Sequence, residues 1–218
     1  PYSVVLRRDL TEPEDDRMLL LDEGEWNLLS TGITRNLLGA WGETPESVFS
    51  VGTDGSIYRF NGSSFNIQPS TTDKVIRAIH GSANDNVWAV GDSGIVMNFN
   101  GLTWTQEESG VTGNFRDVFA ADNGDIFAAG SYMIRRRTAA GAWSYMPAPS
   151  GSWYGIHGTS ADDVWVVGNV GRVNHYNGTS WISKQVPSPK GLRAVLALAE
   201  DNVWIVGESG TILHYNGE

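Results

Sequence analysis

The chain contains no cysteine among its 218 residues. Disulfide bonds, thiolate catalysis and cysteine-ligated zinc sites are therefore excluded. No run reaches the roughly 18 consecutive apolar residues that a membrane-spanning helix needs, and the first residues show no signal-peptide pattern. Positive charge is also scarce, since 15 Lys and Arg stand against 25 Asp and Glu, for a net charge of -10. Such an acidic chain predicts neither nucleic-acid binding nor attraction to an anionic membrane surface.

Glycine and aromatic residues are abundant instead. The chain has 26 Gly and nine Trp, and aromatic residues make up 11% of it. Its length suffices for one substantial core or two small ones. Many glycines and aromatics without long helical patterns predict short strands joined by tight turns.

One short pattern recurs five times along the chain. The stretches "VFSVG", "VWAVG", "IFAAG", "VWVVG" and "VWIVG" end at Gly52, Gly91, Gly130, Gly168 and Gly207, which we call the anchor glycines. They are 38 or 39 residues apart. A constant period of this size indicates one structural unit per repeat.

Each unit is predicted to hold four short strands. In the second unit these are "VIRAIHG" (75–81), "VWAVG" (87–91), "IVMNFN" (95–100) and "TWTQEES". Asn100-Gly101 is a strong hairpin signal between the last two. Four antiparallel strands recurring every ~40 residues are typical of β-propeller blades. A solenoid is the main competitor, but its leucine ladder is absent. We therefore expect an all-β propeller of four-stranded antiparallel blades.

The last repeat supplies only three strands. The segment "EGEWNLLS" (23–30) carries what is missing, a Gly followed by an aromatic residue and an outer strand. We expect five blades, closed by the strand Trp26–Ser30 so that no sheet edge is exposed; six or seven blades are the alternative. The expected organisation is an N-terminal extension over 1–23, which can form a hairpin, and one propeller domain over 24–218, with repeats at about 34–72, 73–112, 113–150, 151–189 and 190–218 plus 24–33.

Two sets of aromatic residues repeat in register, and packing between neighbouring blades explains both sets better than a ligand site. The second-strand set is Phe49, Trp88, Phe127, Trp165 and Trp204, and the outer-strand set is Trp26, Phe65, Trp104, Trp143 and Trp181.

The four histidines give no metal or catalytic pattern. His80 and His157 share a repeat position that holds Trp41, Phe119 and Leu196 elsewhere, which indicates a half-buried aromatic slot. No metal-ligand spacing, nucleophile elbow or phosphate-binding loop occurs. We therefore expect no cofactor, no metal and no assigned catalytic residue.

Arginine recurs at two places that could bind an anion. Arg77, Arg116 and Arg193 share a position on the predicted innermost strand, where they either surround an anionic ligand or form salt bridges with nearby carboxylates. The third repeat also carries "RRRT" (135–138), which is either a solvated strand or a binding patch for a carboxylate, sulfate or acidic partner.

The third repeat departs most from the others, and we expect a ligand there. In propellers the loops after strand two and after strand four share one face. At that face the sequence places Tyr132, Met133, Trp153 and Tyr154, aromatic or apolar residues that could stack on sugars or anchor a peptide. Asp92 and Asn169 occupy equivalent positions where the copies disagree, and they complete the candidate ligand-binding set together with the three inner-strand arginines.

The repeats "IHGTSADDVWVVGNVGRVNHYNGTSW" and "LALAEDNVWIVGESGTILHYNGE" resemble a bacterial repeat family of the BNR or sialidase-like superfamily. The resemblance covers about residues 34–217. It implies a β-propeller, abundant among exported and surface proteins of bacteria. The Asp box Ser-x-Asp-x-Gly-x-Thr-Trp is present only in fragments, and the sialidase arginine triad and Tyr-Glu pair map onto no positions, so no catalytic residue is carried over.

These observations predict a non-catalytic binding or scaffold propeller that recognises a glycan or a protein through one loop face. We expect an extracellular, periplasmic or cell-surface location, no nucleic-acid partner and no membrane insertion; the oligomeric state is not predicted. One alternative is a polysaccharide hydrolase or lyase that uses Asp54, Asp92 and Glu208. Another is a purely architectural or engineered array without a ligand.

Overall fold

The computed structural model describes residues 28–29, 31–147 and 151–218. The chain divides into a short unit, residues 1–32, and a large unit, Ile33–Glu218, that holds every strand of the described residues. The predicted hairpin in 1–23 and Trp26 lie outside the described residues. Leu28 and Leu29 lie outside any strand and are exposed. Closure of the last blade by Trp26–Ser30 therefore stays a prediction.

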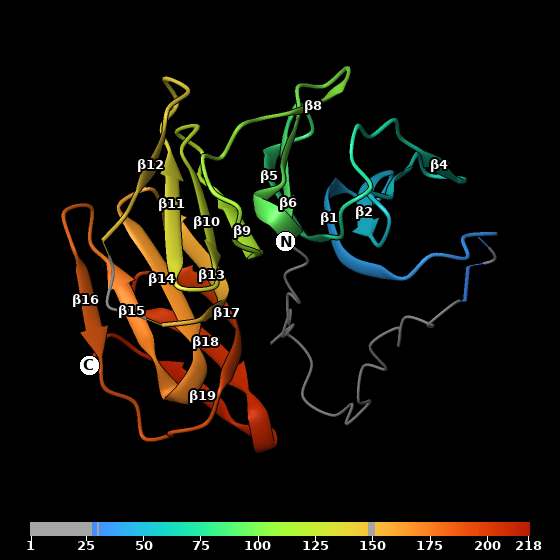
Figure 1. Cartoon of the computed structure of the whole chain (residues 1–218). Coiled ribbons are helices and arrows are strands. Elements are labelled where there is room, and N and C mark those ends of the chain that lie inside the picture. The colour runs from blue at the N-terminus through green and yellow to red at the C-terminus, as the bar shows by residue number, and fades with distance from the viewer. Residues whose placement is uncertain (1–27, 30, 148–150) are drawn as a thin grey trace, which may run out of the picture. The chain divides into compact units, whose positions relative to one another are not determined.

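The large unit consists of five antiparallel sheets whose strands follow chain order (Figure 1). Four sheets have four strands and the fifth has three, which confirms the all-β prediction and the four-stranded unit. Sheet one is β1 (Leu37–Thr44), β2 (Ser47–Gly52), β3 (Ile57–Phe60) and β4 (Phe65–Ile67). Sheet two is β5 (Ile76–Ala83), β6 (Asn86–Gly91), β7 (Val96–Phe99) and β8 (Trp104–Gln106). Sheet three is β9 (Phe115–Ala120), β10 (Ile126–Gly130), β11 (Met133–Arg137) and β12 (Trp143–Tyr145). Sheet four is β13 (Trp153–Ser160), β14 (Asp163–Gly168), β15 (Val173–Tyr176) and β16 (Trp181–Lys184). Sheet five is β17 (Leu192–Ala199), β18 (Asn202–Gly207) and β19 (Ile212–Tyr215).

The anchor glycines are explained by a close approach of two backbones. A Cβ atom at Gly91 would lie 2.0 Å from the carbonyl oxygen of Val75, which no real side chain tolerates. Likewise, a Cβ atom at Gly52 would lie 2.0 Å from the Asn36 carbonyl oxygen, and one at Gly130 would lie 2.1 Å from the Asn114 carbonyl oxygen. Beside that contact, the amide of Asp92 donates to the Val75 carbonyl oxygen at 2.9 Å. The repeated glycine thus lets strand two end tightly against the segment that leads into strand one.

The Asn-Gly hairpins form, but with a longer loop than a two-residue turn. Strand β7 ends at Phe99 and β8 begins at Trp104. Only Gly101 of the pair has a positive φ, 90°. The Asn100 side-chain oxygen instead accepts the amides of Leu102 and Thr103 at 3.1 and 2.9 Å. Asparagine therefore acts here through its side chain, as in an Asx turn.

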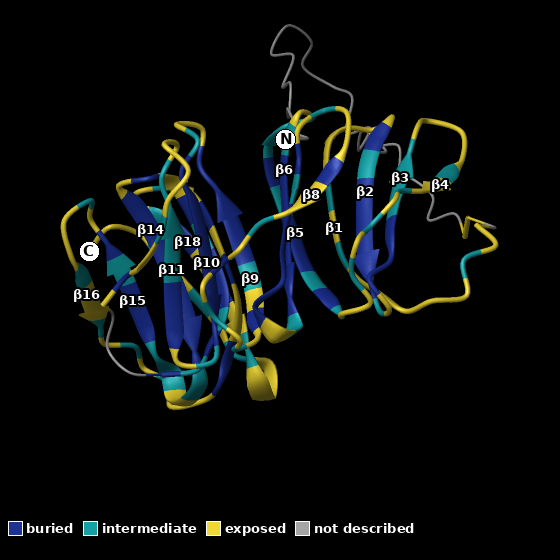
Figure 2. Cartoon of the chain, turned by 45° about the horizontal axis from the view of Figure 1, so that its top comes forward, coloured by how far each residue is buried: buried dark blue, intermediate teal, exposed yellow. Residues whose placement is uncertain are grey.

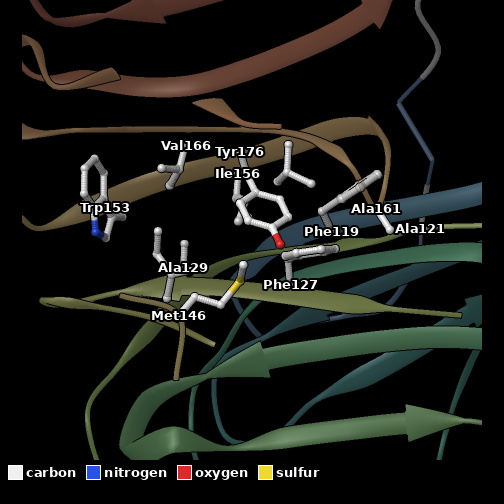
Figure 3. Close-up of a cluster of buried hydrophobic side chains, with 12 residues drawn as sticks. Phe119, Ala121, Phe127, Ala129, Met146, Trp153, Ile156, Ala161, Val166 and Tyr176 are labelled. Carbon is white, nitrogen blue, oxygen red and sulfur yellow. The ribbon is translucent and has the colours of Figure 1, made fainter. Parts of the chain in front are cut away.

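The core lies between successive sheets. Phe49 of sheet one packs against Phe99 and Trp104 of sheet two, with ring centroids 5.2 and 5.7 Å apart. Strands β2, β6, β10 and β14 are almost wholly buried (Figure 2). Figure 3 shows the cluster between sheets three and four, where the Phe127 and Tyr176 rings lie 6.3 Å apart. The second-strand aromatics therefore pack between neighbouring sheets, as predicted.

The fifth sheet is the exception to this burial. Its second-strand aromatic, Trp204, is 42% exposed, whereas Trp88 and Trp165 are buried. Among the described residues no fourth strand pairs with β19. The number of blades and the closure of a ring therefore stay predictions.

Candidate loop-face binding site

The turns that follow the second strands gather at one end of the sheets. Their central residues all have left-handed backbone conformations, with φ between 51° and 59°; they are Asp54, Ser93, Tyr132, Val170 and Ser209. These turns are bonded to the longer loops that enter the next sheet. The amide of Gly55 donates to the Lys74 carbonyl at 2.9 Å, and the amide of Gly171 donates to the Lys190 carbonyl at 2.8 Å. The two loop sets thus form one face.

Tyr132 stands out on this loop face. A glycine follows the left-handed residue in the other four turns, but Met133 follows Tyr132. The Tyr132 side chain is 73% exposed at a conformation that costs a non-glycine residue roughly 1–2 kcal/mol. It borders an open hollow of about 610 Å³ formed with residues 108–113. An exposed aromatic ring held by a strained turn is a candidate ligand contact.

Tyr154 is connected to the Tyr132 turn through the backbone. Ser131 and Ser152 form an isolated antiparallel bridge. Tyr132 directly follows Ser131, and Tyr154 lies two residues beyond Ser152. The Arg116 guanidinium carbon lies 4.8 Å from the centre of the Tyr154 ring, and that of Arg193 lies 4.4 Å from it. Sheets three, four and five thus contribute one stack in which Tyr154 contacts two cations.

The inner-strand arginines differ in their carboxylate partners. Arg77 binds Asp92 with two bonds, of 2.6 and 2.8 Å, and this hydrogen bonding raises the pKa of Arg77. Arg193 forms an ion pair with Glu208 through one guanidinium hydrogen bond. In sheet three the residue after the anchor glycine is Ser131, so Arg116 has no such partner. No ion pair of Arg116 is found in the described part of the chain.

A further pair of the same kind, Arg35 with Asp54, is one that the sequence alone did not suggest. The sequence did hold a signal for this pair, because an acidic residue follows the anchor glycine by one or two positions in sheets one, two and five. Asp54, Asp92 and Glu208, the candidate acid-base residues, all belong to these pairs. Asp92 and Glu208 therefore hold their turns to the inner strands β5 and β17, and Asp54 holds its turn to Arg35 in the segment before β1. No additional observation favours a glycosidase.

Other candidate residues are buried or engaged in the fold. Met133 and Trp153 have buried side chains that belong to core clusters. Asn169 accepts the amide of Ser152 at 3.3 Å and an Arg172 guanidinium hydrogen at 3.0 Å. The candidate residues that remain accessible at the molecular surface for a ligand are therefore Tyr132, Tyr154, Arg116 and Arg193.

The three consecutive arginines of β11 are internally paired. Arg137 occupies the position of Phe99 and Tyr176, lies 4.7 Å above the Trp88 ring, and binds Glu107 at 2.7 and 2.9 Å. The Arg136 and Arg135 guanidinium groups donate to Asp125 and to the Ser109 carbonyl, respectively. The interpretation of "RRRT" as a free anion-binding patch is therefore wrong, because the β9–β10 turn of the same sheet and the loop after β8 already supply its partners.

The two inner histidines connect neighbouring sheets. His80 Nδ1 accepts the amide of Ala120 at 3.2 Å, and His157 Nδ1 accepts that of Ala197 at 3.2 Å. Burial, with the charge of His157, lowers the pKa of His80 to about 4, and burial lowers the pKa of His157. Both rings pack on Phe119, at 5.4 and 5.3 Å. The predicted aromatic slot is confirmed.

Asp117 is a half-buried acid on the inner strand β9. Its two oxygens accept the amides of Ile156 and Val118 at 2.8 and 2.9 Å. Burial nevertheless raises the pKa of Asp117 to about 7. The equivalent position in sheet two is Ala78, so this carboxyl group is specific to sheet three.

The described residues lack the features of two other classes of site. They contain no group of three or more His, Asp or Glu side chains placed to hold a metal ion. They also contain no helix long and apolar enough to cross a membrane.

Comparison with known proteins identifies relatives in structure only. No protein-family model and no curated protein matches the chain. The solved structure "YCF48 bound to D1 peptide" is similar with a TM-score of 0.55 and 14% identity, over 90% of this chain and 82% of that chain. The WD40 β-propeller domain of Doa1 has a TM-score of 0.71 at 10% identity, over 84% and 66% of the two chains. The extracellular domain of the hybrid two-component system BT3049 from B. thetaiotaomicron has a TM-score of 0.68 at 12% identity.

This chain spans about two thirds of the Doa1 domain and 29% of the BT3049 domain. At such low identities the likeness is one of fold. It supports the propeller class that the repeats predict, while membership of the BNR or sialidase-like repeat family has no matching family model. The five sheets are therefore propeller-like, and their function must be argued from the site itself.

Proposed function

We propose that this chain is a non-catalytic binding module that recognises a segment of another protein through its loop face. The observation that carries the proposal is Arg116, which stacks on Tyr154 but lacks the carboxylate partner that Arg77 and Arg193 have. Arg116 is exposed, so its guanidinium group can bind a carboxylate with two parallel bonds. The exposed Tyr132 ring then offers an apolar contact at the same end of the sheets.

The chemistry of this site defines the segment. A guanidinium group and two phenol rings suit a peptide that carries a carboxylate beside an aromatic or aliphatic side chain. Because the protein has a net charge of -10, a local cation is needed for such a ligand to approach. The similar YCF48 structure contains a D1 peptide, which supports a peptide ligand in this class of fold.

A display library of random peptides, screened beside a glycan array, tests the proposal. We expect enrichment of peptides with an acidic residue, and at least tenfold weaker binding by Arg116→Ala and Tyr132→Ala. Ser209→Ala is the matched control, because Ser209 occupies the position of Tyr132 in sheet five. If the chain binds a glycan but no peptide, and Tyr132→Ala abolishes that binding, then the ligand of this site is a sugar and not a protein.

We also propose that this recognition takes place outside the cytoplasm. The resemblance to exported repeat proteins supports this location, and one structural neighbour is described as an extracellular domain. Cell fractionation tests it, since recovery of the protein only from the cytosol would contradict the proposal.

A further inference from the structure

Sheet four contains a hollow of about 480 Å³ between its third and fourth strands and the loops that adjoin them. One side is formed by the turn before β15 and the first residues of that strand, and the other by residues 183–189 at the end of β16. Val170, Val186 and Pro187 give it apolar walls. Small-molecule sites typically measure roughly 300–1,000 Å³. The hollow is therefore large enough for an organic molecule and not only for an inorganic ion.

Two half-buried cations, Arg172 and Lys184, border this hollow. The Arg172 guanidinium group donates one hydrogen bond, at 3.0 Å, to the side-chain oxygen of Asn169. The Lys184 ammonium group lies 5.8 Å from the centre of the Trp165 ring. Within the described part of the chain no carboxylate forms an ion pair with either cation. Two cations without a counter-charge favour an anionic ligand.

Asn174 of β15 places a buried polar side chain at the same hollow. The residue is only 2% exposed, and its amide nitrogen has no hydrogen-bond partner. Buried polar groups of folded proteins nearly always have such a partner. Ser183 lies directly opposite Asn174 in the register of β15 and β16, so the two side chains share one face of the sheet. Beside the cations, the hollow thus offers hydrogen-bonding groups that suit hydroxyl groups.

Sheet two shows that the fold itself does not require these polar residues. The equivalents of Arg172 and Asn174 are Ile95 and Met97, which are both buried in the core between sheets one and two. The equivalent hollow of sheet two measures only about 250 Å³, and carboxylates such as that of Glu108 border it. A larger hollow with positive charge is therefore a feature of sheet four that packing does not explain.

We propose that this hollow binds a small carboxylate that also carries hydroxyl groups, of the size of a uronic acid. Arg172 holds the carboxylate, Lys184 adds positive charge, and Asn174 and Ser183 bond the hydroxyl groups. An inorganic oxyanion would satisfy the cations but would leave the apolar walls and Asn174 without contacts. The site is separate from the loop-face peptide site, because Arg116 does not border the hollow.

The test titrates the isotope-labelled full chain with glucuronate and follows its amide signals by nuclear magnetic resonance. We expect saturable shifts in residues 170–173 and 183–188. Glucose, which lacks the carboxylate, should bind at least tenfold more weakly, and so should sulfate, which lacks the hydroxyl groups. Sulfate that binds as tightly as glucuronate would show that the site takes any oxyanion and would overturn the proposal, as would the absence of saturable shifts with glucuronate.

Variants locate the binding. Arg172→Gln should weaken glucuronate binding at least tenfold, and Asn174→Met, which copies Met97 of sheet two, should abolish it without lowering the urea midpoint of unfolding. Lys74→Gln is the matched control, because Lys74 borders the equivalent hollow of sheet two, and it should bind as the wild type does. Shifts that are lost in Arg116→Ala but kept in Arg172→Gln would assign the acid to the loop-face site and would overturn this inference alone.

Discussion

At the scale of single residues, Tyr132 combines backbone strain with exposure. Its φ of 59° suits glycine, so Tyr132→Gly should raise the free energy of unfolding by about 1 kcal/mol. The same change removes the proposed ligand contact. Urea unfolding and peptide titration measure the two effects separately. Ser209→Gly should give the gain in stability without the loss of binding, and equal binding by both variants would argue against a role for the Tyr132 ring.

Asp117 makes stability fall as the pH rises. Its pKa of about 7 in the folded protein exceeds the ordinary value of 3.8, so the folded protein keeps a proton that the unfolded chain releases. This contribution is fully present below about pH 4 and is lost as pH rises through 7. Relative to Asp117→Ala, the wild type should lose about 4 kcal/mol between pH 4 and pH 8. Urea unfolding across this range checks it, and parallel curves for the two proteins would contradict it.

His80 has the opposite dependence. Its pKa of about 4 in the folded protein lies below the ordinary 6.5, so its stabilising contribution is present above pH 6.5 and is lost as pH falls towards 4. His80→Phe copies the Phe119 of sheet three and does not titrate. At pH 7 this variant should be about 1 kcal/mol less stable, because the Ala120 amide loses its acceptor. Below pH 5 it should unfold at higher urea than the wild type; an unchanged order would contradict the prediction.

At the scale of elements, β11 shows how one strand can replace aromatic packing by cation-π packing. Arg137→Ala removes both the Trp88 contact and the Glu107 bonds, and should cost about 2–3 kcal/mol in unfolding free energy. Adding Glu107→Ala should cost little more, since the acid has already lost its arginine and keeps only the 3.2 Å hydrogen bond from Trp143 Nε1. Thermal unfolding of the two single variants and the double variant measures this coupling. Strictly additive losses would show that the pair is not coupled.

The repeat alone predicted the strands, their antiparallel order and the buried second-strand aromatics, because these follow from local patterns that occur five times. The partners of Arg135, Arg136 and Arg137 could not be predicted in the same way. They come from a turn and a neighbouring sheet, such as Asp125 and Glu107, and only the register between sheets brings them together. The selection of Arg116 likewise required knowledge of its carboxylate-bonded equivalents, Arg77 and Arg193.

At the scale of the whole molecule, protection from solvent should decrease at the fifth sheet. Trp204 is 42% exposed, whereas its equivalents in sheets two and four are buried. Amides of β18 and β19 should therefore exchange with deuterium faster than those of β6 and β7. Hydrogen-exchange mass spectrometry measures this. Equal protection of all sheets would contradict the expected difference.

The sequence suggested a position for the candidate loop-face site but not which residues belong to it. The disagreement between repeats pointed to the third turn, where the structure leaves Tyr132 exposed, because a surface residue is free to vary where the fold does not constrain it. Whether a side chain at such a position faces solvent depends on packing in three dimensions. Met133 and Trp153 were therefore grouped with Tyr132 from the sequence, although their side chains are buried.

The contacts of the inner histidines affect how the number of repeats in such a protein can change. Each ring accepts an amide of the next sheet, and the inter-sheet ring contacts described above join successive sheets, apart from the His80–His157 contact of 5.6 Å between sheets two and four. Stability is then close to a sum of nearest-neighbour contributions. Duplication or loss of a whole repeat exchanges one complete junction for another and leaves the remaining junctions intact. The array can therefore lengthen or shorten by recombination without a redesigned core, while a cut inside a repeat would break two junctions at once.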